Sequence, residues 1–154
     1  MNAQETRSPS EPVWIAVCCL AIILALVVGV GVVSGLFLHH LVQTLPLWVG
    51  VGLGFGRSRA AGWIGLPLFL FWLVVMVIVW LYLFGIVHFI NGHFSTLEIA
   101  VTIVVAVASV VGIAMFWGLK SALSMASGAA LFIVFGLIQW VCFRAGFLPA
   151  IALR

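Results

Sequence analysis

Long apolar runs alternate with short polar or charged breaks along this chain. Four runs are apolar over about 18 residues or more, a pattern typical of membrane-spanning helices because a hydrocarbon core of about 30 Å takes about 20 helical residues. They cover residues 13–38, 66–90, 97–117 and 125–143. The first run is longer than the roughly 7–15 apolar residues of a cleavable signal peptide, so we expect it to remain as a first span.

Residues 45–56 are harder to assign. They read LPLWVGVGLGFG and are followed by Arg57 and Arg59. Twelve helical residues reach about 18 Å, and extension back to Leu41 gives about 24 Å, both short of the roughly 30 Å required. The sequence therefore predicts an all-α integral membrane protein with four full transmembrane helices plus a short membrane-inserted helix or re-entrant segment, with five spans as the alternative.

The positive charges distinguish these two topologies, because Lys and Arg near span ends favour the cytoplasmic side. With a cytoplasmic N-terminus, a non-crossing segment 45–56 leaves three cations on each side, whereas a crossing segment puts four inside and two outside. The four are Arg7, Arg57, Arg59 and Lys120, and the two are Arg144 and Arg154. The charge count favours five spans, whereas helix length favours four.

Composition places this arrangement in a lipid bilayer. The chain is 66% hydrophobic and 6% charged, too little polar surface for a water-soluble globule. The scattered cations exclude a nucleic-acid face, which needs clustered Lys and Arg. Residues 1–12 are polar and predict a disordered tail, and residues 13–154 predict one polytopic domain. Scarce Lys, Asn and Tyr with no Asp are associated with bacterial proteins, which suggests a bacterial plasma membrane.

The inventory of reactive side chains argues against an enzyme. The chain has no Asp and only three Glu, so carboxylate-pair catalysis is excluded. No G-x-S-x-G or H-E-x-x-H pattern occurs. The three cysteines Cys18, Cys19 and Cys142 lie inside apolar runs and are expected to behave as small buried hydrophobes, with no metal site.

Small residues four positions apart predict close helix packing. Gly31 and Gly35 form one such pair and Ala108 and Gly112 another, and bare faces of this kind let a second helix approach closely. The leading functional prediction is a small non-enzymatic membrane protein, either self-associating or an accessory or anchor subunit that packs on other transmembrane helices.

Two other functions remain open. A re-entrant segment with glycines at alternate positions can expose carbonyls to an ion, as channel filters do, which suggests a transporter or channel. The glycines are Gly50, Gly52, Gly54 and Gly56. Paired imidazoles near span ends can hold a b-type heme, although the leading functional prediction includes no cofactor. The candidate ligands are His39, His40, His88 and His93, provided that His39 and His88 share one side of the bilayer.

A local motif marks the start of the third full run. Ser95 is followed three residues later by Glu98, the spacing of a capping box in which the two side chains satisfy free amide groups of the first turn. We therefore expect Ser95 to cap the helix that follows.

Overall fold

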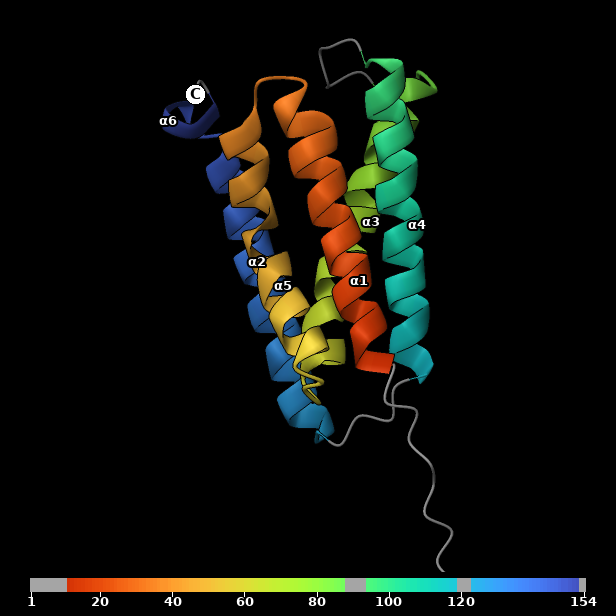
Figure 1. The fold of residues 1–154 in the computed structure, drawn as a ribbon, viewed down its shortest axis with the longest axis vertical. Coiled ribbons are helices and arrows are strands. Elements are labelled where there is room, and N and C mark those ends of the chain that lie inside the picture. The colour runs from red at the N-terminus through yellow and green to blue at the C-terminus, as the bar shows by residue number, and fades with distance from the viewer. Residues whose placement is uncertain (1–10, 88–93, 119–122, 153–154) are drawn as a thin grey trace, which may run out of the picture.

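The computed structural model describes residues 11–87, 94–118 and 123–152, and this part of the chain is a bundle of helices (Figure 1). The helices are α1 (Glu11–Leu24), the π-helix η1 (Ala25–Val32), α2 (Phe37–Phe55), α3 (Ala61–Leu83), α4 (Thr96–Gly118), α5 (Met125–Gly146) and the short α6 (Pro149–Ala152). Successive long helices run in opposite directions, so α1 begins at the end of the bundle where α2 finishes (Figure 1).

Four helical stretches among the described residues are long and apolar enough to span a membrane. They are Pro12–Val32, Ala61–Leu83, Thr96–Gly118 and Met125–Gly146. The prediction of an all-helical chain with four helices of this kind is confirmed. Two predicted boundaries of the first run are wrong. The helix already begins at Glu11, and the apolar run to Leu38 breaks into a turn, where Gly35 takes a φ of +72°.

The largest difference concerns α2. The expected short segment at 45–56 is the second half of a 19-residue helix that begins at Phe37, which corresponds to about 28 Å of helix. It contains His39, His40 and Gln43, which the sequence suggests lie at an interface. The helix is longer than the predicted short segment, since His39 bonds the Gly146 carbonyl and the Gln43 main-chain carbonyl accepts from Gln139, which keeps this polar stretch inside the bundle.

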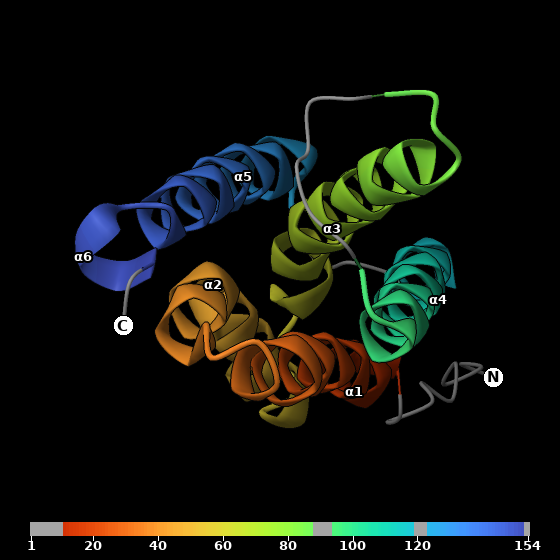
Figure 2. The same ribbon diagram turned by 90° about the horizontal axis from the view of Figure 1, so that it is seen from above.

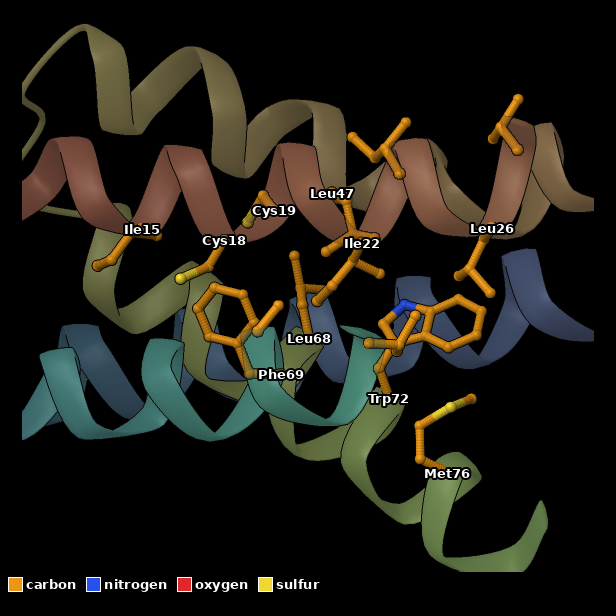
Figure 3. Close-up of a cluster of buried hydrophobic side chains, with 14 of the residues drawn as sticks. Ile15, Cys18, Cys19, Ile22, Leu26, Leu47, Leu68, Phe69, Trp72 and Met76 are labelled. Carbon is orange, nitrogen blue, oxygen red and sulfur yellow. The ribbon is translucent and has the colours of Figure 1, made fainter. Parts of the chain in front are cut away.

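The apolar core lies where α1, α2 and α3 meet. Ile22, Leu47, Leu68, Phe69 and Trp72 are all at most 2% exposed, and Figure 3 shows their side chains between the helices. Their burial gives the bundle one continuous core.

Helices α1 and α2 approach each other closely through glycine. A Cβ placed on Gly50 would lie 2.7 Å from Cys19 Sγ, and one on Gly54 would lie 2.7 Å from the Ala16 Cβ. Both distances are shorter than side chains tolerate, so these two positions need glycine for packing.

Helix α5 is the outermost long helix. Seen along the bundle it packs beside α2 and α3, on the opposite side of α3 from α4 (Figure 2). Only 11% of its most apolar window is buried, compared with 50% for the first span. Most of α5 therefore presents apolar side chains away from the bundle.

The predicted capping box is confirmed. The Ser95 main-chain N–H donates to Glu98 Oε2 at 2.7 Å, and the Glu98 N–H donates to Ser95 Oγ at 3.2 Å. Local spacing was sufficient for this prediction because all partners lie within one helical turn.

Candidate functional site

The first two turns of α2 carry an unusual number of buried polar side chains. Relative exposure is 8% for His39, 2% for Gln43 and 0% for Thr44. Thr44 Oγ1 donates to the carbonyls of His40 and Leu41, at 2.9 and 3.1 Å, so its hydroxyl is satisfied within the helix. The histidines and Gln43 need partners elsewhere.

Pro46 disturbs the helical hydrogen bonds at this point. It lies inside α2 and has no N–H, so the carbonyl of Val42, four residues earlier, loses its helical donor. Such freed main-chain groups are satisfied by neighbouring helices when a helix lies in an apolar environment. The neighbour that approaches here is α5.

Two hydrogen bonds tie α5 to α2. Gln139 Nε2 donates to the main-chain carbonyl of Gln43 at 3.0 Å, and His39 Nδ1 lies 2.7 Å from the carbonyl oxygen of Gly146. Because a carbonyl only accepts, Nδ1 of His39 carries the proton. We call these four residues, His39, Gln43, Gln139 and Gly146, the α2–α5 joint.

Glycine is required at the end of this joint. A Cβ on Gly146 would lie 2.8 Å from Gln43 Cγ and 3.2 Å from the carbonyl oxygen of His39. The joint therefore combines two hydrogen bonds with a close main-chain approach.

Some buried polar atoms in and near the joint have no hydrogen-bond partner. Four buried side-chain atoms in the described part of the chain have no hydrogen-bond partner, namely His40 Nδ1, Gln43 Nε2, Trp72 Nε1 and Gln139 Oε1. Two of them belong to the joint itself. Buried polar atoms are nearly always paired in folded proteins, which sets these four apart from the rest of the described core.

Aromatic rings border the joint on the α3 side. The Trp72 and Phe143 rings lie 6.3 Å apart, and Phe143 is one helical turn beyond Gln139 on α5. Phe147 packs edge-on against Phe143 at 5.2 Å and against His39 at 4.8 Å. These rings form an apolar wall around the polar groups.

The candidate heme ligands are only partly placed. His39 and His40 lie edge-on with ring centroids 4.8 Å apart. As consecutive residues of one helix they project in directions about 100° apart, so they cannot bind one iron from opposite faces. His88 and His93 lie outside the described residues. Within the described ranges, no group of three His, Cys, Asp or Glu residues could hold a metal ion.

The glycine segment does not form an extended filter. Residues 50–55 are α-helical, and the Gly52 carbonyl accepts a hydrogen bond from Gly56 N–H at 2.9 Å. Gly50 and Gly54 pack on α1, whereas a Cβ on Gly52 would meet nothing within 4 Å. The expectation of exposed carbonyls from a re-entrant strand of glycines is therefore wrong.

The predicted packing pairs behave differently from each other. A Cβ on Gly31 would lie 3.2 Å from Phe37 Cα and 3.3 Å from His40 Cδ2, so Gly31 accommodates the first turn of α2. A Cβ on Gly35 would meet no atom within 4 Å, and Gly35 has a positive φ, which makes it a turn residue. The interpretation of Gly35 as a packing residue within this chain is wrong.

The second pair lies inside the bundle. Ala108 and Gly112 are buried on α4. A Cβ on Gly112 would lie 2.5 Å from Cε2 of Phe69, a fully buried core residue of α3. These two positions therefore serve contacts between α4 and the rest of this chain.

Two of the three topology charges, Arg57 and Arg59, lie at one end of the described bundle. Arg57 and Arg59 are exposed in the connection between α2 and α3, and Arg57 has a φ of 53°. Lys120 lies outside the described residues, between the end of α4 and the start of α5. The ends of α2 and α4 and the starts of α1, α3 and α5 all lie at this end (Figure 1).

Sequence reasoning missed the joint, although the signal was present. Gln43 and Gln139 are the two glutamines of the apolar part of the chain, and polar side chains within such runs often mark functional positions. Their pairing across 96 residues could not be read from local spacing.

In comparisons with known proteins, no family model matches this chain, and no significant match occurs among curated proteins or solved structures.

Proposed function

We propose that this chain is a small, non-enzymatic protein of a bacterial plasma membrane that crosses the bilayer five times and contacts other transmembrane helices through α5. The observation that carries the proposal is the outward face of α5. Three of its large apolar residues, Ile133, Leu137 and Val141, follow one another at intervals of four and are 59%, 61% and 62% exposed.

The fifth crossing is supported by two properties of α2. Its length of about 28 Å approaches the roughly 30 Å of a hydrocarbon core. Its antiparallel course also brings Arg57 and Arg59 to the end where α1 begins (Figure 1). With a cytoplasmic N-terminus this gives the four-to-two charge distribution that the positive-inside rule favours.

A packing role is supported by how polar groups are used. In the described part of the chain, His39 and Gln139 each form an interhelical hydrogen bond to a main-chain carbonyl, and these two bonds join α2 to α5. The glycines at positions 50, 54 and 112 accommodate neighbouring helices. An outward apolar helix face on such a rigid bundle suits contact with a further transmembrane helix, either from a second copy or from another subunit.

Cysteine cross-linking in native membranes tests the proposal. In a chain with Cys18, Cys19 and Cys142 replaced by Ala, Leu137→Cys places one thiol midway along α5. Val107→Cys is the matched control, because it lies midway along α4 and is 56% exposed. We expect a photoactivatable cross-linker attached to the introduced thiol to give a cross-linked product for Leu137→Cys only, of twice the chain mass for a second copy or of another mass for a different subunit.

Equal cross-linking at both positions, or none at either, would contradict the role of α5. The product mass then distinguishes self-association from an accessory role.

Flux measurements on purified protein in liposomes test the transporter or channel alternative, for which Gly52→Ala and Gly54→Ala are the informative variants.

One observation favours a heme-binding role as a second candidate. A ligand histidine commonly donates its second ring N–H to a main-chain carbonyl, and His39 does so to Gly146. An absorbance scan of the purified protein tests this role. A Soret band that is lost in His39→Ala would support it, and a wild-type protein without a Soret band would exclude it.

A further inference from the structure

Arg57 occupies a backbone position that ordinarily takes glycine. Its N–H donates to the Gly54 carbonyl at 3.0 Å. The Ser58 N–H donates to the Leu53 carbonyl at 2.8 Å, and the two bonds together end α2. This is the pattern of a Schellman motif, in which the residue at the position of Arg57 has a positive φ and is usually glycine. Arg57 has a φ of 53°, although a glycine directly precedes it. The arginine therefore carries backbone strain that glycine would avoid.

The connection between α2 and α3 is held by its main chain and by Ser58. The Oγ of Ser58 accepts a hydrogen bond from the Ala60 N–H at 3.3 Å. Arg57 and Arg59 are both exposed. Glu98, the only acid whose side chain the structure describes, lies in the first turn of α4 at the opposite end of the bundle (Figure 1). Among the described side chains, the two guanidinium groups therefore have no acid near them that neutralises their charge.

Exposed tryptophans mark the level of the lipid headgroups at this end of the bundle. Trp14 lies in the first turn of α1 and Trp117 in the last turn of α4, and both are exposed. The start of α1 and the end of α4 lie at the end where α2 finishes (Figure 1). Tryptophan is enriched where hydrocarbon meets headgroups. With the bundle inserted along its long axis, Arg57 and Arg59 therefore lie at the level of the lipid phosphates.

We infer that the connection between α2 and α3 binds the headgroup of an anionic phospholipid through Arg57 and Arg59. Arginine binds phosphate oxygens through paired N–H donors, and its positive charge favours a lipid with a net negative charge over a zwitterionic one. In the proposed five-span topology this end faces the cytoplasm, where the leaflet surface is negative. The inference rests on the membrane insertion of the proposed function, and it is independent of the contact made by α5.

Native mass spectrometry of the full chain in detergent tests this inference, by titration with phosphatidylglycerol and, separately, with phosphatidylcholine. We expect the first phosphatidylglycerol to bind more tightly than the first phosphatidylcholine. Arg57→Gln and Arg59→Gln should each raise the Kd for phosphatidylglycerol about five-fold, because one arginine near an anionic surface contributes about that factor. The Kd for phosphatidylcholine should not change.

Arg144→Gln is the matched control, because Arg144 is also exposed but lies in the last turn of α5, at the opposite end of the bundle (Figure 1). It should leave both Kd values unchanged. Equal Kd values for phosphatidylglycerol in the wild type and in both α2–α3 variants would overturn the inference. Displacement of the lipid by inorganic phosphate would also overturn it, since a free anion would then be the ligand. A wild-type chain recovered outside the membrane fraction would contradict the proposed function instead.

Arg57→Gly separates lipid binding from support of the helix end. Glycine relieves the strain of the positive φ, so without anionic lipid the variant should unfold at the same temperature as the wild type or at a higher one. Its Kd for phosphatidylglycerol should nevertheless rise as in Arg57→Gln. A lower unfolding temperature would show that the charge of Arg57 stabilises the carboxyl end of α2 through the helix dipole, and would overturn its assignment to a lipid.

Discussion

Gln139 on α5 donates a hydrogen bond of 3.0 Å to the main-chain carbonyl of Gln43 on α2, across 96 residues of sequence. Both residues are almost completely buried, although α5 is otherwise the least covered of the four apolar helical stretches long enough to span a membrane in the described part of the chain. The contact lies three residues before Pro46, where the helix lacks one of its own N–H donors. The carbonyl that loses its helical donor is that of Val42, one residue before this acceptor, so the contact joins the outermost helix to the turn of α2 that Pro46 interrupts.

Replacing Gln139 with Leu should weaken the attachment of α5. Interhelical hydrogen bonds in membrane proteins average about 0.6 kcal/mol and reach about 1.7 kcal/mol, and a loss of about 1 kcal/mol is expected because the Gln43 carbonyl is also left buried. Reversible unfolding in mixed detergent micelles measures the change. Leu137→Ala, on the outward face two residues earlier, should change stability by less than about 0.5 kcal/mol. Equal effects of both variants would show that the joint adds nothing.

The glycines give a matched pair of alanine variants. Gly112→Ala places a methyl group 2.5 Å from Phe69, which is fully buried and cannot move freely, and overpacking of this kind typically costs about 1–3 kcal/mol. Gly52→Ala meets open space, and removal of a helix-interior glycine should stabilise the protein by up to about 1 kcal/mol. Thermal unfolding of the two proteins in the same detergent measures this difference. If Gly52→Ala is the more destabilising of the two, the packing described for α3 and α4 is wrong.

The capping box at α4 predicts a modest and local effect. Ser95→Ala removes the acceptor of the Glu98 N–H and should cost about 1 kcal/mol of stability. Amide hydrogen exchange of the first turn of α4 should increase, because its free N–H groups lose a partner. Ser34→Ala is the control, since its hydroxyl bonds the carbonyl of Val30 at an exposed site and caps no helix start. Exchange in α4 should not respond to the control, and an unchanged first turn in Ser95→Ala would contradict the role of the box.

Cysteine labelling from either side of sealed vesicles distinguishes four spans from five. Ser34→Cys lies in the turn before α2, and Gly56→Cys lies just after α2, both at exposed positions. If α2 crosses the bilayer, a membrane-impermeant reagent should label the two from opposite sides, with Gly56→Cys on the side of the N-terminus.

The control for this experiment is Ser127→Cys, exposed in the first turn of α5 at the same end of the bundle as Gly56. It should be labelled from the same side as Gly56→Cys. Labelling of Ser34→Cys and Gly56→Cys from one common side would show that α2 returns without crossing.

The amino-acid sequence by itself determined the four long apolar helices and the capping of α4 by Ser95. Both follow from local properties: the length of an apolar run is set by consecutive residues, and the partners of a capping box lie within one turn. The hydrophobic share of 66% and the placement of charges at run ends predict the same class of protein.

Only the tertiary structure decided the extent of α2 and the role of each glycine. His39 and the main-chain carbonyl of Gln43 are held inside the bundle by α5 groups that lie about 100 residues away in the sequence. Gly35 and Gly112 are the same residue type, yet one supplies a positive φ in a turn and the other makes room for Phe69. Long-range contacts assign these roles, because the free energy of burying a polar group or a bare helix face depends on what lies opposite it.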